Sequence, residues 1–221
     1  MRDEYRADLL QVNKLLVWMA DAVRSAMSRA TNALLTADQT DAEEVVARDA
    51  EVNALYRLVE DKVYDLCARQ APVASDLRLL LTALHLAADL ERMGDLADHV
   101  AKATLRRHPA RVVPDSLAPT FEQMGTVADR IAAKISSAIS NLDVVAAGQL
   151  ERDDDAMDKL HADLFATMFA PGWDGGTEAA VDTALLGRFY ERYADHAVNA
   201  GRHVVFLVTG ETLDTREAAK S

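Results

Sequence analysis

The sequence has one cysteine, five prolines and no long hydrophobic run. A lone Cys67 excludes an internal disulfide, fits a reducing compartment and predicts a small core residue rather than a nucleophile. The first ten residues, MRDEYRADLL, lack the hydrophobic region of a signal peptide. The densest apolar run, 204–208, is far shorter than the roughly 18 residues of a membrane span. We therefore expect a cytoplasmic protein with no direct membrane insertion.

Positive charge is also scarce. There are 24 Lys and Arg residues against 36 Asp and Glu residues, so the formal net charge is −12. Such a chain repels a phosphate backbone, which disfavours nucleic acid as a partner. The excess acids suit metal cations or a basic partner surface, or they simply keep the surface soluble.

Motifs of several enzyme classes are missing from the sequence. It has no phosphate-binding P-loop, no G-x-G-x-x-G, no G-x-S-x-G and no Cys/His zinc spacing. A ferritin-like di-iron oxidase would need Glu-x-x-His motifs, and none of the six histidines has Glu three positions earlier. We therefore expect no enzymatic activity and no catalytic residues.

The prolines mark boundaries in a chain that is otherwise typical of long helices. None of them interrupts a stretch with helical apolar spacing, and β-branched alternation is scarce, which predicts an all-α protein. A capping box from Thr40 to Glu43 is expected to open the second helix. The predicted helices are 4–37, 41–69, 73–107, 117–141, 148–169 and 178–209. They group into a three-helix bundle at 1–108, a linker at 109–119, a second three-helix bundle at 120–210 and a frayed tail at 211–221.

The two predicted bundles share an internal repeat. Shifting the chain by 100 positions lays LERMGDLADH (90–99) over YERYADHAVN (190–199). Shifting it by 105 positions lays RDAEVNALY (48–56) over DDDAMDKLH (153–161). We therefore predict two tandem bundles that arose by duplication, with the matched segments on the second and third helices of each.

Acidic residues four positions apart recur within these matched segments. Residues at i and i+4 share one face of a helix, where two acids repel each other unless a cation separates them. Oxygen ligands suit Mg²⁺, Mn²⁺, Ca²⁺ or iron, and several carboxylates can bridge ions into a multinuclear cluster. A solvated acidic face paired with Arg92 and Arg192 is the simpler alternative. The predicted metal ligands are Asp49, Glu91 and Asp95 in the first half and Asp154, Asp158, Glu191 and Asp195 in the second, with Asn53 as a further oxygen donor.

For other polar residues near these motifs, the sequence leaves more than one role open. His99 and His196 lie next to the acids and are metal ligands, outer donors or simply packed residues. Asp98 has no acidic counterpart in the second half, so a local role is expected, either solvated or paired on its helix. In APVASDLR (71–78), Asp76 and Arg78 are either ordinary helix-start residues or part of a polar contact site.

With two three-helix bundles, APVASDLR before the third helix, and LERMGD paired with YERYADHAVN, the chain resembles the PhoU family of phosphate-uptake regulators over about 4–209. The resemblance implies a cytoplasmic, homodimeric negative regulator of phosphate uptake and of the phosphate-starvation response. It implies an adaptor between the phosphate ABC transporter ATPase and a sensor histidine kinase. It also implies a multinuclear metal cluster, with iron first and magnesium, manganese or zinc still open. Asn199 matches the family's asparagine after the second motif.

Two departures from the family pattern and two alternative functions stay open. Asn53 replaces an acid and His99 stands where the second half has Asn199, so the first site is expected to hold fewer ions. The second half has GGTEAA in place of D-L-R. The alternatives are a metal-dependent hydrolase that activates water, and a metal or phosphate buffer with no partner.

Overall fold

The computed structural model describes residues 2–211, and its side chains are described from residue 4. Residues 212–221 of the predicted tail lie outside the described range. The described chain is helical, which confirms the all-α prediction. Its helices are α1 (Arg2–Thr36), α2 (Gln39–Gln70), α3 (Ala74–Arg107), α4 (Ala118–Asn141), α5 (Val144–Gly148), α6 (Leu150–Met168) and α7 (Gly176–Thr209).

The start of α2 differs from the prediction. Asp38, in an extended conformation, accepts a hydrogen bond from the backbone N–H of Asp41 at 3.1 Å and so caps the helix. The predicted cap at Thr40 is therefore wrong, because an acid two residues earlier satisfies the free N–H group first. At the other end, Ala71 adopts a left-handed conformation and ends the helix before Pro72.

The predicted fifth helix, 148–169, corresponds to α6, and a short helix that was not predicted, α5, precedes it. Leu142 adopts a left-handed conformation with φ 52° and ends α4. Asp143 then accepts hydrogen bonds from the N–H groups of Val145 and Ala146, at 2.9 and 3.0 Å, which starts α5. An aspartate at this position can cap a short helix on its own, and the apolar spacing used to place helix 148–169 does not register a cap.

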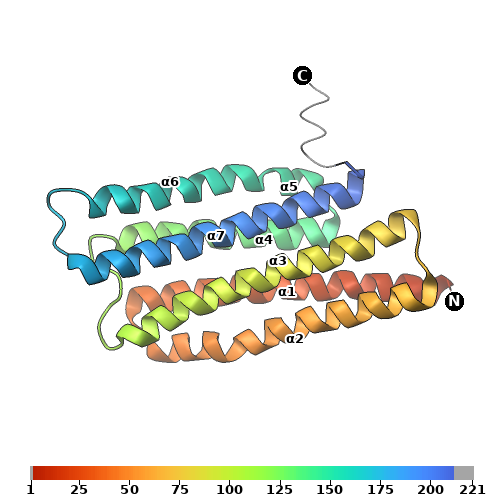
Figure 1. Ribbon diagram of the computed structural model, residues 1–221, viewed down its shortest axis with the longest axis horizontal. Coiled ribbons are helices and arrows are strands. Elements are labelled where there is room, and N and C mark those ends of the chain that lie inside the picture. The colour runs from red at the N-terminus through yellow and green to blue at the C-terminus, as the bar shows by residue number, and fades with distance from the viewer. Residues whose placement is uncertain (1, 212–221) are drawn as a thin grey trace, which may run out of the picture.

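Equivalent helices of the two halves pack against each other. Helix α1 packs on α4, and α3 packs on α7, while α2 and α6 do not touch each other. Figure 1 shows that both central pairs run antiparallel, with α2 and α6 on opposite outer sides. Between α1 and α4, Arg24 binds Asp129 through two hydrogen bonds of 2.7 and 2.9 Å, and Ser136 donates to Asp21 at 2.8 Å.

The halves share one hydrophobic core. Two fully buried tyrosines of α7 bond to α1: the Tyr190 hydroxyl lies 2.7 Å from the Thr31 hydroxyl, and the Tyr193 hydroxyl donates to the Val23 carbonyl at 3.2 Å. The segment predicted as a linker contributes the buried side chains of Val112, Val113 and Leu117. The boundaries drawn at 108 and 120 stay a prediction.

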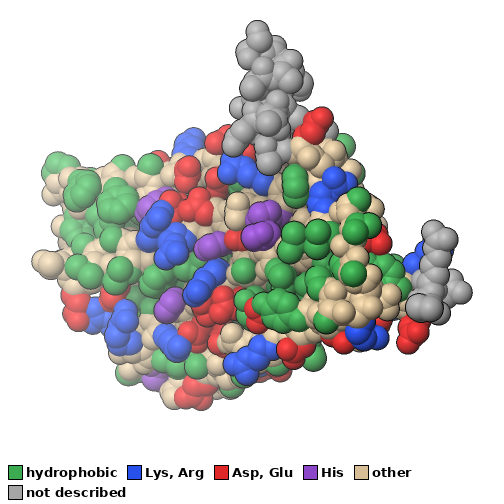
Figure 2. All heavy atoms as spheres, turned by 45° about the vertical axis from the view of Figure 1, so that its right-hand side comes forward, with side chains coloured by type: hydrophobic (Ala, Val, Ile, Leu, Met, Phe, Trp, Pro, Cys, Tyr) green, Lys and Arg blue, Asp and Glu red, His purple; other side chains and the backbone are tan. Residues whose placement is uncertain are grey.

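The surface mixes acidic, basic and hydrophobic side chains. Figure 2 shows hydrophobic side chains gathered on the end of the molecule that is turned forward. No helix within residues 2–211 is long and apolar enough to cross a membrane.

Candidate functional site

Four carboxylates from two helices form what we call the second acidic cluster: Asp154 and Asp158 of α6 with Glu191 and Asp195 of α7. Burial and repulsion by the other three raise the pKa of Asp154 to about 6. Burial and repulsion by Asp195 also raise the pKa of Glu191. One carboxylate oxygen of Asp154, Oδ1, is buried without a hydrogen-bond partner. The cluster therefore lacks compensating positive charge around its most buried member.

Neighbouring contacts hold the second acidic cluster in position. Beside Asp154, the buried Asp153 accepts from Arg130 at 2.9 Å and from Lys134 at 2.5 Å, which fixes α6 on α4. Glu191 forms an ion pair with Arg188, one turn earlier on α7. The predicted partner Arg192 makes no ion pair with a described residue.

His161 lies at the edge of this cluster and is not among the predicted metal ligands. Its Nε2 atom is buried with no hydrogen-bond partner. Gly187 allows the imidazole to lie against α7, because a Cβ there would fall 2.9 Å from His161 Cδ2. Burial and the nearby Arg188 lower the pKa of His161, although Asp158 acts in the opposite direction. The result is a neutral imidazole beside the carboxylates.

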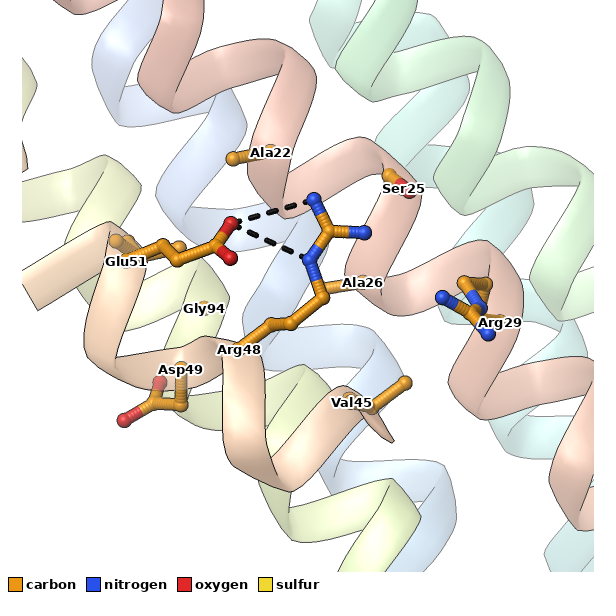
Figure 3. Close-up of a pocket in the computed structure, with 10 residues that line it drawn as sticks. Ala22, Ser25, Ala26, Arg29, Val45, Arg48, Asp49, Glu51 and Gly94 are labelled. Carbon is orange, nitrogen blue, oxygen red and sulfur yellow. Dashed lines mark hydrogen bonds and ion pairs between the residues drawn. The ribbon is translucent and has the colours of Figure 1, made fainter. Parts of the chain in front are cut away.

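The first acidic cluster consists of Asp49 on α2 with Glu91, Asp95 and Asp98 on α3. Burial and repulsion by Asp98 and Asp95 raise the pKa of Asp49, and burial with repulsion by Asp95 raises that of Glu91. Asn53 donates its amide to Asp49 Oδ2 at 2.8 Å. In Figure 3 the Asp49 carboxylate points away from the guanidinium of Arg48, which instead pairs with Glu51.

Two cations partly neutralise the first acidic cluster. Arg92 Nη1 donates to Asp95 at 2.9 Å, and Arg92 Nε lies 3.5 Å from Glu91. Lys102 Nζ lies 2.5 Å from Asp98 Oδ2. Asp98 is 6% exposed, so the expectation of a solvated acid is wrong and the alternative of pairing on its own helix is confirmed. The first cluster is thus better compensated than the second.

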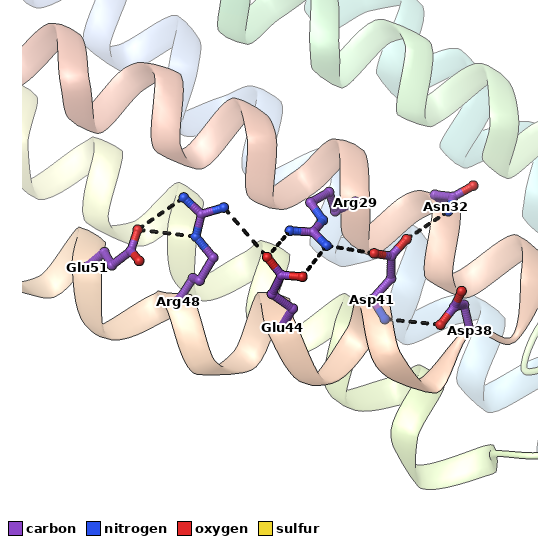
Figure 4. Close-up of polar contacts among 7 residues, drawn as sticks. All are labelled: Arg29, Asn32, Asp38, Asp41, Glu44, Arg48 and Glu51. Atoms are coloured by element: carbon purple, nitrogen blue, oxygen red, sulfur yellow. Dashed lines mark hydrogen bonds and ion pairs between the residues drawn. The ribbon is translucent and has the colours of Figure 1, made fainter.

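A polar network joins α1 to α2 in the turns of α2 next to Asp49. Figure 4 shows this row of charged side chains along α2, with Arg29 and Asn32 of α1 beside it. Arg29 reaches Asp41 at 2.7 Å and Glu44 at 2.5 Å, and Asn32 donates to Asp41 at 3.0 Å. These contacts hold the first turns of α2 against α1.

A third polar group, which we call the clasp, joins α3 to α7: Asp89, His196, Asn199 and His203. The buried Asp89 carboxylate accepts from Asn199 at 3.0 and 3.2 Å, and Asp89 Oδ1 lies 3.0 Å from His196 Nδ1. His203 Nε2 lies 3.6 Å from Asp89 Oδ2, and its ring stacks on His85 with centroids 5.0 Å apart. Burial lowers the pKa of His203. His196 and Asn199 therefore make their hydrogen bonds to Asp89 of the clasp.

The clasp shows where the repeat has diverged. Asp89 lies opposite Asn199, and the residues offset by 100 positions, Phe189 and His99, lie opposite each other as well. The His99 ring stacks on Phe189 with centroids 5.2 Å apart. The same two positions thus meet twice, once as a hydrogen-bonded pair and once as a stacked pair.

Asp89, His85 and His203 are polar contacts that the repeat comparison missed. The comparison selects positions that are alike in both halves, and the counterpart of Asp89 is Phe189. The signal that could have found them is the i, i+4 spacing of His85 and Asp89 on one helix face.

Arg78, from the motif APVASDLR, makes its contacts within the chain. Its guanidinium lies 6.0 Å from the ring of Phe206, and a Cβ added at Gly210 would fall 2.5 Å from Arg78 Nη1. Its Nε atom is buried with no hydrogen-bond partner. Arg78 therefore lies against the end of α7 rather than extending into solvent.

The acidic clusters are not assembled metal sites as the side chains stand. Within residues 2–211, no group of three or more His, Cys, Asp or Glu side chains is placed to hold a metal ion. The oxygen donors of the second acidic cluster nevertheless fit a hard cation in chemistry, and the unpartnered Asp154 oxygen is an unsatisfied buried acceptor. The role of the predicted ligands stays a prediction.

Known proteins are similar to this chain in sequence and in fold. A family model described as "PhoU domain" matches residues 16–104 and again 121–204. The chain is 42% identical over 210 residues to "Phosphate-specific transport system accessory protein PhoU homolog 2" of Mycobacterium tuberculosis, covering 95% of this chain and 99% of the relative. It is 41% identical to homolog 1 of Mycobacterium leprae, covering 95% of each chain.

A solved structure extends the likeness to three dimensions. The crystal structure of PhoU from Pseudomonas aeruginosa matches with a TM-score of 0.82 and 25% identity, covering 94% of this chain and 100% of that one. The two family matches fall on the two halves that pack α1 on α4 and α3 on α7. The resemblance drawn from the repeated acidic motifs is confirmed, and the chain belongs to the PhoU family.

Proposed function

We propose that this protein is a regulatory accessory protein of phosphate-specific transport, which restrains phosphate uptake and the phosphate-starvation response when phosphate is plentiful. The observation that carries the proposal is the 42% identity along nearly the whole length of a relative named as an accessory protein of that transport system. As a cytoplasmic homodimer, the protein would dock the transporter ATPase and a sensor histidine kinase. Its role is binding, with no catalytic residue assigned.

We also propose that the second acidic cluster binds divalent cations or iron. Asp154, Asp158, Glu191 and Asp195 would hold the ions after small side-chain rotations, with His161 as a neighbouring nitrogen donor. Crowding of four carboxylates, an unpartnered Asp154 oxygen and a single paired arginine support this assignment. A bound cation would supply positive charge that joins α6 to α7. The first acidic cluster, with Arg92 and Lys102 in place, would bind more weakly.

The regulatory proposal is tested by deleting the gene and following a phosphate-starvation reporter in phosphate-rich medium. We expect the reporter to be derepressed and the wild-type gene to restore repression. A reporter that stays silent after deletion contradicts the proposal. Co-purification of the transporter ATPase and the kinase with the tagged protein tests docking separately from output.

The metal proposal is tested by elemental analysis of the purified full chain and of the double variant Glu191→Gln with Asp195→Asn. Both substitutions keep side-chain shape, so the helices should stay folded while metal content falls at least tenfold. The matched control is Glu151→Gln with Asp163→Asn, two exposed acids of α6 outside the cluster. Equal metal content in the two double variants would rule the second acidic cluster out.

A further inference from the structure

A cavity lies between α1, α3, α4 and α7, at the end of the molecule where α1 and α3 begin and α4 and α7 end. Its volume is about 340 Å³, within the range of small-molecule sites in proteins. Aliphatic side chains of all four helices line it, among them Leu16, Leu86, Ile139 and Val204. Leu10 and Leu142 stand at its rim and are 63% and 46% exposed. Figure 2 shows the hydrophobic side chains at this end.

The polar part of the cavity is confined to one helix. Among the described residues that line it, Arg6 is the only charged one and Asn13 the only other polar one. They are seven positions apart, two turns along the same face of α1. Neither makes a hydrogen bond or ion pair to another described residue. An apolar cavity with one unpaired cation at one end matches a ligand that is apolar along its length and anionic at one end.

The shape of the cavity favours an extended hydrocarbon chain over an α-helix as its ligand. The lining positions on α1 run from Arg6 to Leu16, a distance of roughly 15 Å along the helix axis. A volume of about 340 Å³ spread over that length leaves a slot narrower than an α-helix, which is about 10–12 Å across with its side chains. An extended hydrocarbon chain fits such a slot.

We propose that this cavity binds a free long-chain fatty acid, with the carboxylate at Arg6 and the hydrocarbon chain running along α1 past Asn13. The ligand site is separate from both acidic clusters and goes beyond the proposed role in phosphate transport. The net charge of −12 makes a local cation necessary for an anion to bind, and Arg6 supplies it.

The experiment is calorimetric titration of the full chain with dodecanoate below its micelle concentration, with dodecan-1-ol as the uncharged probe of the same chain length. We expect one dodecanoate per chain, tighter binding than dodecan-1-ol, and an affinity that rises about fourfold per added methylene from octanoate until the slot is full. Arg6→Gln should weaken dodecanoate about fivefold and leave dodecan-1-ol unchanged. The matched control, Lys14→Gln, removes an exposed cation of the same helix that does not line the cavity.

A second variant tests the slot itself. Ala83 is buried and lines the cavity, so Ala83→Leu should fill it and abolish binding of both probes. Thermal melting shows whether this variant folds, and Arg6→Gln, at an exposed position, keeps the proposal testable if it does not. The proposal is overturned if Arg6→Gln and Lys14→Gln bind dodecanoate alike, if chain length has no effect, or if the protein binds phosphatidylglycerol vesicles but not free dodecanoate.

Discussion

Asp154 is a carboxyl group whose ionisation the fold opposes. Its pKa is raised to about 6 from an ordinary value of 3.8, so the native state holds the proton more tightly than the unfolded state does. Between about pH 4 and pH 6 the native state therefore binds more protons, and the free energy of unfolding falls as the pH rises. Above about pH 7 the penalty is fully present in metal-free protein.

We expect Asp154→Asn to raise the free energy of unfolding of the metal-free protein by about 1–2 kcal/mol at pH 7.5, after allowance for solvent screening. Near pH 4 the difference should almost vanish, because the protonated acid and the amide are then nearly equivalent. Urea denaturation at both pH values measures this. The control Asp163→Asn, at an exposed acid of the same helix, should stay within about 0.5 kcal/mol. A gain independent of pH would contradict the assignment.

The internal repeat predicted which acidic side chains come together, but not which cationic side chains pair with them. Asp154, Asp158, Glu191 and Asp195 come together because an i, i+4 pair on each of two packed helices must face the same seam. The ion pairs of Arg188 and Lys102 were not predicted. A long cationic side chain can reach several acidic neighbours, and sequence spacing does not show which one it pairs with.

Among the elements, the antiparallel pair of α3 and α7 depends on the clasp. Asp89 is buried and accepts from Asn199 and His196, so removing its carboxylate removes these hydrogen bonds and leaves a gap between α3 and α7. We expect Asp89→Ala to lower the free energy of unfolding by about 1.5–3 kcal/mol. Asp129→Ala, which removes the half-exposed ion pair of α1 and α4, should lower it by at most about 1 kcal/mol. Equal losses in denaturant titration would show that the clasp is unimportant.

Helix existence was predictable from apolar spacing, whereas helix ends were not. The ends at Asp38 and at Asp143 depend on single hydrogen bonds to backbone N–H groups, which hydrophobic periodicity does not register. The packing of α1 on α4 could not be predicted from the sequence either, because an apolar helix face does not indicate which helix packs against it.

In the whole molecule, the two halves share one core, so we expect them to unfold together. Tyr190 and Tyr193 of α7 are fully buried and bond to α1, across the division between the halves. A fragment of residues 1–117 would expose the faces of α1 and α3 that α4 and α7 cover. We predict one cooperative thermal transition for the full chain, and self-association or loss of cooperativity for the fragment, measured by calorimetry and light scattering. Two separate transitions in the full chain would contradict this.

The antiparallel pairing of equivalent helices gives the chain the geometry of a symmetric dimer fused end to end. In a dimer of identical repeats, one substitution at an isologous contact changes both copies of that contact at once. Covalent fusion removes this constraint. The equivalent positions Asp89 and Phe189 illustrate this freedom. Asp89 is a buried hydrogen-bond acceptor for Asn199, whereas the ring of Phe189 stacks on His99.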